Sequence, residues 1–221
     1  MSNPTVIICI DGLDPEYLEA CETPNISSLK DRGFSKNGRC IMPSVTNVNN
    51  VSLVTASYPE THGISSNYRL VRETGEEIYM ESGEYILAET MFQKAHKQGK
   101  RSIVVTSKDK LRTLLSEGAS YTVSAERPDD WVVSGVGQPP DIYSLEVNNW
   151  LIRAAIYIMS HQYTDLVYIT TTDYAMHTYA PAEPESQRHM TILDDAIGEL
   201  ADAHPNATIL ITADHGMSTK S

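Results

Sequence analysis

Thr5–Ile10 reads TVIICI, a short and continuous apolar run rich in β-branched residues, and Asp11 follows it directly. Further runs of the same character are Ser102–Val105, Asp165–Thr170 and Thr208–Thr212. Continuous apolar runs of this length are typical of strands that are buried on both faces of a parallel sheet. The first run therefore predicts a strand of such a sheet, with an acidic residue at its carboxyl end.

Helical periodicities separate these runs. Apolar residues recur at helical spacing in Tyr85–Gln98, Asn148–His161 and Glu185–His204. Ser124–Ser144 is rich in Pro, Gly and Asp and has no periodicity, which predicts a long loop. Because strands and helices alternate, we expect an α/β fold: a mostly parallel sheet with helices on both faces.

Composition limits the class of protein. The 221 residues fit one large domain, and the 41% hydrophobic content is enough for a buried core. The sequence contains no run of about 18 apolar residues, so no membrane span is predicted. No basic segment of a secretory signal precedes the first strand. The net charge of −12 disfavours nucleic acid as a partner. We therefore expect neither a membrane nor a nucleic acid to be bound.

The cysteines indicate the compartment. Cys9, Cys21 and Cys40 are odd in number and irregularly spaced, so they predict neither a disulfide framework nor a CxxC metal site. A reducing cytoplasm is the expected location.

Polar residues follow three of the apolar runs. Asp11 follows the first, Asp173 and His177 follow the third, and Asp214 and His215 follow the last. Ligands of open α/β sheets gather outside the carboxyl ends of the strands. Carboxylate oxygens combined with imidazole nitrogens suit Zn²⁺, and also Mn²⁺ or Fe²⁺. A single Asp in such a place is more often a turn or helix cap, but the set as a whole predicts a metal site.

Thr46 adds a candidate nucleophile to this site. Pro43 and Ser44 precede it, and the helical pattern within Met42–Ala56 follows it. At a helix N-terminus its hydroxyl lies in the positive end of the helix dipole, where backbone N–H groups also hold anions. Metal coordination is a recognised way to activate a hydroxyl nucleophile. The simpler alternative is that Thr46 only caps the helix.

These residues resemble the alkaline-phosphatase superfamily, in its branch with nucleotide pyrophosphatases/phosphodiesterases and phosphonoacetate hydrolase. The motifs that carry the resemblance are Asp-Gly at residue 11, Pro-Ser-x-Thr at 43–46, Tyr-Pro-x-Thr-His-Gly-Ile at 58–64, Asp-x3-His at 173–177 and Ala-Asp-His-Gly-Met at 213–217. The resemblance implies two Zn²⁺ ions. One would be held by Asp11, Thr46, Asp214 and His215, and the other by Asp173 and His177. His62, in the third motif, is expected to be structural.

The resemblance to phosphonoacetate hydrolase also implies a substrate. Asn67 would donate a hydrogen bond to a phosphonate oxygen, and Lys108 and Lys110 would bind the substrate carboxylate. The expected partner is therefore a small anionic phosphonate, and the expected reaction is hydrolysis of the C–P bond of phosphonoacetate through a phospho-Thr46 intermediate. A second copy of the chain, in a homodimer, stays open as a further partner.

Two other functions stay open. The first is a phosphodiesterase or nucleotide pyrophosphatase, which would need an aromatic slot for the base; Tyr68 and Tyr85 are candidates without an evident pair. The second is a non-catalytic domain that keeps the fold. A sulfatase is disfavoured because the Cys/Ser-x-Pro-x-Arg motif of sulfatases is missing.

The resemblance ends where the chain ends. After Gly216 only five residues remain, whereas the relatives continue through a lid region and a final His ligand. The other histidines, His96, His161, His189 and His204, read as helix or helix-edge positions. We therefore expect residues 1–221 to be the N-terminal part of a single alkaline-phosphatase-like catalytic domain, which binds one Zn²⁺ tightly and the second loosely.

Overall fold

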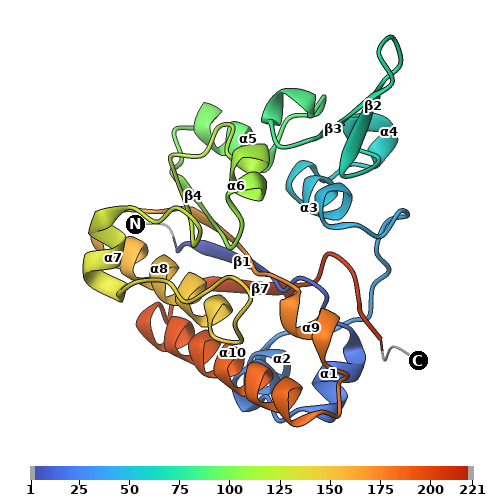
Figure 1. The fold of residues 1–221 in the computed structure, drawn as a ribbon. Coiled ribbons are helices and arrows are strands. Elements are labelled where there is room, and N and C mark those ends of the chain that lie inside the picture. Colours follow the sequence, from blue (N-terminus) through green and yellow to red (C-terminus); the bar gives the residue numbers. More distant parts are fainter. Residues whose placement is uncertain (1–2, 219–221) are drawn as a thin grey trace.

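Five parallel strands form the central sheet of the computed structural model, in which residues 3–218 are described (Figure 1). The order across the sheet is β5-β4-β6-β1-β7. The strands are β1 (Thr5–Cys9), β4 (Ser102–Thr106), β5 (Tyr121–Ser124), β6 (Leu166–Thr170) and β7 (Thr208–Thr212). The mostly parallel sheet predicted from the apolar runs is confirmed, and β5 extends it at one edge.

The register of the sheet brings three strand ends to one level. β1 lies between β6 and β7, and Cys9 pairs with Thr170 on one side and with Thr212 on the other. Parallel strands in this register leave the sheet side by side at their carboxyl ends. The residues that follow them are therefore neighbours in space, although Gly12 and Asp214 lie 202 positions apart in sequence.

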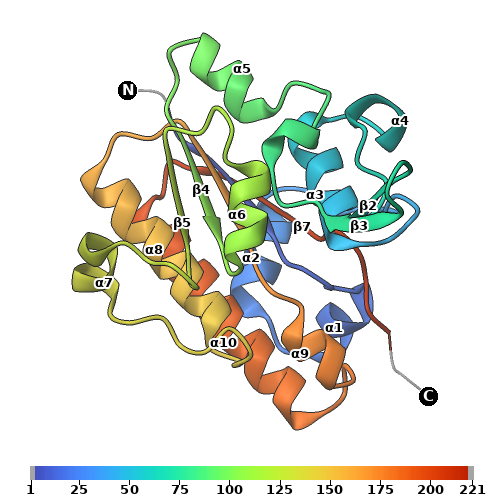
Figure 2. The ribbon, with the colours of Figure 1, turned by 45° about the horizontal axis from the view of Figure 1, so that its top comes forward.

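Helices cover both faces of this sheet (Figures 1 and 2). One layer contains α1 (Pro15–Ala20), α2 (Pro24–Arg32), α8 (Val147–His161) and α10 (Pro184–Ala203). The other contains α3 (Thr46–Thr55), α5 (Met91–Lys97) and α6 (Asp109–Leu115). Strand side chains alternate between the two layers: Val6 and Ile8 pack in the first core, and Cys9 packs in the second. This double burial explains why the strands read as continuous apolar runs.

Shorter elements lie between these helices and strands along the chain. They are α4 (Pro59–His62), the antiparallel hairpin β2 (Tyr68–Val71) and β3 (Glu76–Tyr79), η1 (Gly83–Tyr85), α7 (Asp130–Val136) and α9 (Tyr174–Thr178). Among the described helices, none is long and apolar enough to cross a bilayer. All three cysteines are free thiols.

The helix predicted over Tyr85–Gln98 is wrong in its first half. The helix begins at Met91, and Leu87 is 78% exposed in the segment before it. The reason is a capping box: the Thr90 hydroxyl accepts from the backbone N–H of Gln93, and the Gln93 side chain accepts from the backbone N–H of Thr90. This reciprocal pair fixes the helix start at that point.

The long loop predicted over Ser124–Ser144 is also wrong in part, because it contains α7. Val132 of this helix is fully buried, and the Trp131 ring lies 5.3 Å from the ring of Tyr157 on α8. Packing against α8 therefore stabilises a short helix whose own sequence shows no amphipathic period.

Candidate active site

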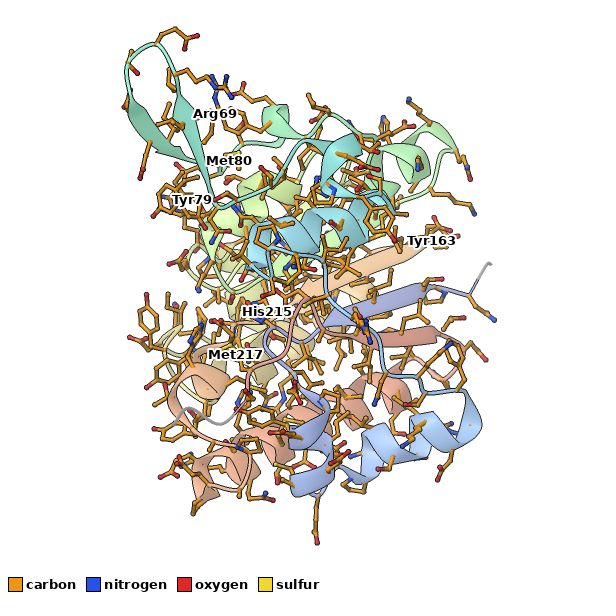
Figure 3. The ribbon with its side chains drawn as sticks, turned by 90° about the vertical axis from the view of Figure 1, so that its right-hand side faces the viewer. Arg69, Tyr79, Met80, Tyr163, His215 and Met217 are labelled. Atoms are coloured by element: carbon orange, nitrogen blue, oxygen red, sulfur yellow. The ribbon has the colours of Figure 1, made fainter. Side chains whose placement is uncertain are left out.

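Three ligand-type side chains converge where β1, β6 and β7 end. One ligand atom each from Asp11, Asp173 and His215 lies within 4.8 Å of the other two, and all three residues are buried. Figure 3 shows His215 in the middle of the molecule, below Tyr79 and Met80 in that view. Residues predicted from separate strand ends are thus neighbours, because the strands share one register.

This cluster fits a divalent metal ion. Within residues 3–218, Oδ1 of Asp11 is buried and has no hydrogen-bond partner, and Nε2 of His215 lies 3.4 Å from it. A buried carboxylate oxygen without a hydrogen bond is costly unless a cation neutralises it. Two carboxylates and an imidazole form a donor set that suits Zn²⁺ and also Mn²⁺ or Fe²⁺.

Asp214 lies beside this cluster and is held by several donors. Its Oδ1 accepts from the backbone N–H groups of Gly12 and His215 at 3.3 and 2.9 Å, and its Oδ2 lies 3.7 Å from Nε2 of His215. The Asn50 amide donates to the same Oδ2 at 3.3 Å. The carboxylate is therefore fixed in one orientation, with Oδ2 toward the His215 imidazole.

His177 joins the site through Asp173. His177 lies on the short helix α9, and its Nε2 lies 2.6 Å from Oδ2 of Asp173, the N-cap of that helix. The compact cluster therefore contains residues of both expected metal sites: Asp11 and His215 were expected at one, and Asp173 at the other. This arrangement suits two metals only about 3.5–4 Å apart.

The electrostatics of the site are strongly negative. Burial raises the pKa of Asp11 well above its usual range, and the charges of Asp214 and Asp173 raise it further, while Lys108 opposes the shift. Burial also raises the pKa of Asp214, against the lowering effect of His215. Mutual repulsion of buried carboxylates favours a bound cation.

Thr46 is the first residue of α3, so the predicted placement at a helix N-terminus is confirmed. Val45 before it is extended and serves as the N-cap. Thr46 is half-buried and lines a cavity of about 450 Å³ together with Asp11, Asp173 and His177. Thr46 therefore borders the same cavity as these three residues, whereas Asp214 and His215 are not part of its lining.

The predicted substrate-binding residues line this cavity too. Lys108 is the N-cap of α6 and Lys110 lies in its first turn; both contribute to the wall, as does Asn67. The ammonium of Lys110 lies 4.6 Å above the Tyr79 ring and 3.9 Å from the Glu81 carboxylate. A larger hollow of about 600 Å³ beside α5 includes none of these residues in its lining.

His62 is a structural residue in the described fold. It is fully buried, its Nε2 lies 2.8 Å from the Ser52 hydroxyl, and its Nδ1 accepts from the backbone N–H of Ile64. This tautomer makes Nε2 the donor to Ser52. The interactions join α4 to α3, and burial lowers the pKa of His62.

Sequence reasoning missed several residues around the cavity. Tyr143 and Tyr174 both line it, with ring centroids 5.9 Å apart. Tyr68, one of the two aromatic candidates, pairs instead with Tyr79 at 5.1 Å. Asn50 and Tyr168 read as ordinary helix and strand residues, although they support Asp214. Aromatic residues near the strand ends were a signal in the sequence that could have identified the cavity wall. No signal in the sequence shows which group a buried asparagine will contact.

Comparisons with known proteins identify the family of the chain. Residues 5–221 match the family described as Type I phosphodiesterase / nucleotide pyrophosphatase. Ectonucleotide pyrophosphatase/phosphodiesterase family member 1 of Rattus norvegicus is 28% identical in an alignment of 227 residues that covers 98% of this chain and 24% of the relative. A venom phosphodiesterase of Naja atra is 25% identical in an alignment of 229 residues that covers 97% of this chain and 26% of the relative. The chain thus spans about a quarter of these relatives.

Solved structures resemble the fold over nearly the whole chain. Phosphonoacetate hydrolase from Sinorhizobium meliloti 1021, in complex with phosphonoacetate, is 35% identical with a TM-score of 0.89, and the match covers 97% of this chain and 56% of that one. Murine ectonucleotide pyrophosphatase / phosphodiesterase 5 shares the fold at 16% identity and a TM-score of 0.70, over 99% of this chain and 58% of that one. With its parallel sheet, its strand-end cluster and a family match from residue 5 onward, the chain belongs to the type I phosphodiesterase / nucleotide pyrophosphatase family and has the alkaline-phosphatase-like fold.

Proposed function

We propose that the site hydrolyses the C–P bond of phosphonoacetate to acetate and phosphate, with two Zn²⁺ ions as cofactors. The observation that carries the proposal is a single cavity lined both by Asp11, Asp173 and His177 and by Lys108 and Lys110. A substrate with a phosphonate and a carboxylate needs metal ligands for the first group and a further cation for the second. The 35% identity to a structure in complex with phosphonoacetate supports this choice.

Thr46 is the proposed nucleophile. Its oxygen attacks phosphorus in line as the hydroxyl proton is lost. The C–P bond breaks with its electron pair on carbon, and that carbon takes up a proton to give acetate. Water then hydrolyses the phospho-Thr46 ester to phosphate and restores the hydroxyl. When bound, the metal ions supply Lewis-acid activation of the hydroxyl and charge neutralisation at phosphorus.

The other residues orient the substrate. Oδ1 of Asn67 accepts from the backbone N–H of Asn47 at 3.4 Å, which leaves the Asn67 NH₂ group to donate to a phosphonate oxygen. The positive end of α3 favours the same anion. Lys108 and Lys110 would pair with the carboxylate and stabilise the charge that develops as the acetate group leaves.

A second candidate is a phosphodiesterase or nucleotide pyrophosphatase. The family match favours it, and so do Tyr143 and Tyr174, which bring aromatic surface to the cavity. A base could stack on such a surface. The two candidates differ in what binds beyond the phosphorus, and a substrate panel separates them.

The panel compares phosphonoacetate, an aryl phosphate ester without a carboxylate, and a nucleotide aryl ester in the zinc-loaded protein. Lys108→Ala with Lys110→Ala should reduce kcat/KM for phosphonoacetate by roughly 10- to 100-fold per lost charge-assisted contact, and leave the aryl ester largely unaffected. Thr46→Ala should reduce turnover of every substrate by on the order of 10³-fold or more. Phosphate or aryl-alcohol release measures each rate.

A matched control removes the same number of positive charges at positions outside the cavity. Lys30→Ala with Lys94→Ala removes two exposed lysines from α2 and α5 and should leave all substrates unchanged. If the Lys108/Lys110 variant lost kcat/KM equally for phosphonoacetate and the aryl ester, the lysines would not bind the substrate carboxylate. Preferred hydrolysis of the nucleotide ester would establish the second candidate instead.

A further inference from the structure

We propose that Asn50 is a positioning residue that holds Asp214 and the first turn of α3 in a fixed relation; the inference rests on the proposed function. Its Nδ2 donates to the Asp214 carboxylate at 3.3 Å and to the Thr46 carbonyl at 3.1 Å. Its Oδ1 accepts from the Tyr168 hydroxyl at 2.8 Å. One amide thus bridges the proposed nucleophile's own peptide, a proposed metal ligand and the central strand β6.

The chemistry of the partners determines how this amide is oriented. The Thr46 carbonyl and the Asp214 carboxylate can only accept, so the NH₂ group must face both of them. Oδ1 then faces Tyr168, whose hydroxyl is the donor. Both NH₂ hydrogens and the carbonyl oxygen are in use, and the reversed amide would turn its oxygen toward two acceptors and lose the bonds to Thr46 and Asp214. Asn50 is fully buried, as is Tyr168, so no solvent competes for these groups.

The bridge fixes distances that the proposed reaction depends on. Thr46 lies on a helix in one layer, whereas Asp214 follows β7 at the edge of the sheet. Outside this bridge, the Asp214 carboxylate meets groups at the ends of β1 and β7: the backbone N–H groups of Gly12 and His215, the Asp11 carboxyl and the His215 imidazole. Within residues 3–218, Asn50 therefore supplies the hydrogen bond that links the Asp214 carboxylate to α3, the helix that begins with Thr46. Groups that hold a ligating carboxylate from outside the metal commonly contribute 10- to 100-fold to metal affinity.

A purely structural role predicts a different pattern of effects. Ser52 lies two residues further along α3, is also buried, and bonds to His62 away from the cavity. If Asn50 only stabilised the helix, Asn50→Ala and Ser52→Ala would both lower the melting temperature, and neither would change the affinity for zinc. If Asn50 positions Asp214, only its variant changes zinc affinity.

The experiment is zinc titration against a chromophoric chelator, without substrate, alongside thermal unfolding. Asn50→Ala should weaken the tightest zinc site by roughly 10- to 100-fold. Tyr168→Phe keeps the ring packed on Phe92 but removes the hydroxyl that orients the amide, so it should weaken zinc in the same direction by a smaller factor. Ser52→Ala should lose thermal stability at unchanged zinc affinity. Where Asn50→Ala does not fold, Tyr168→Phe decides the question.

Zinc affinities within twofold of the unaltered protein in both Asn50→Ala and Tyr168→Phe would overturn the inference. Because the assay contains no phosphonate, a protein whose zinc affinity depends on Asn50 but which hydrolyses no phosphonoacetate would support this inference and refute the proposed substrate. A protein that binds no zinc at all would overturn both.

Discussion

Single residues at the strand ends concentrate negative charge in a buried place. Asp11, Asp173 and Asp214 are at most 7% exposed, and Oδ1 of Asp11 makes no hydrogen bond within residues 3–218. His215 is the buried imidazole that lies close to Asp11 and Asp214. Such a group of carboxylates weakens the metal-free fold, because like charges repel strongly where little water screens them. The same repulsion makes a bound dication stabilising.

Asp11→Asn tests this balance. The variant removes one buried charge at nearly constant volume, so the metal-free protein should melt about 2–4 °C higher, equivalent to ~1 kcal/mol for a chain of this length. Zinc should raise the melting temperature of the unaltered protein and have little effect on the variant. Differential scanning calorimetry with and without zinc measures both effects.

Asp195→Asn is the control, since Asp195 is an exposed carboxylate on α10. Asp195→Asn should change the melting temperature of the metal-free protein by no more than about one degree. The rise in melting temperature on adding zinc should change by no more than the same amount. An Asp11→Asn protein with the full zinc-dependent rise would show that Asp11 is not a ligand.

At the scale of elements, α8 holds the segment that leaves β6 toward the site. Oδ1 of Asn148 accepts from the backbone N–H of Thr172, and its NH₂ group donates to the Thr172 carbonyl, both at 3.0 Å. The last sheet-type bond of this segment runs from the Thr171 N–H to the Cys9 carbonyl, and the Asn148 bonds take over at the next residue. One buried side chain thus guides the backbone from the strand to Asp173.

Asn148→Ala should therefore cost about 2–4 kcal/mol in the free energy of unfolding, since two backbone groups lose their buried partner. Denaturant unfolding measures the loss. Asn149→Ala is the matched control, because the Oδ1 of Asn149 has no hydrogen-bond partner in the described residues, and it should cost under about 0.5 kcal/mol. Similar losses in both variants would show that helix propensity, rather than the clamp on Thr172, sets the effect.

For the whole molecule, buried histidines couple folding to pH. His189 on α10 is 1% exposed, its Nδ1 lies 3.0 Å from the Leu145 carbonyl, and burial lowers its pKa. The folded state therefore keeps His189 neutral at pH values where the unfolded chain binds a proton. The stability that this residue contributes is complete above the unfolded pKa of about 6.5 and is lost as pH falls below it.

His189→Gln should make the fall in unfolding free energy between about pH 6.5 and 5 shallower, by at most ~1.4 kcal/mol per pH unit. The raised pKa values of Asp11 and Asp214 act in the opposite direction, so the informative quantity is the difference between variant and unaltered protein. Denaturant unfolding at several pH values gives that difference. His96→Gln, which changes an exposed histidine on α5, should leave the slope as it was; an unchanged slope in His189→Gln would contradict the prediction.

The sequence by itself determined the four strands β1, β4, β6 and β7, the long helices α8 and α10, and the residues at the strand ends; it gave no sign of β5 or of the hairpin β2–β3. These features depend on local pattern: continuous apolar runs, helical periods, and polar residues directly after them. The expected histidine positions also agree, since His96, His161 and His189 lie within helices and His204 caps α10. The cytoplasmic location and the homodimer stay predictions.

Only the tertiary structure decided where elements stop and what supports the site. The capping box at Thr90 shortened one predicted helix, and packing of Trp131 on Tyr157 created α7 within a predicted loop. Asn50 gave no sign of its role, because its partners Tyr168 and Asp214 lie 118 and 164 residues away. A local pattern reports which face of an element is buried. It cannot report which distant group a buried amide meets, since that depends on the order and register in which the strands assemble.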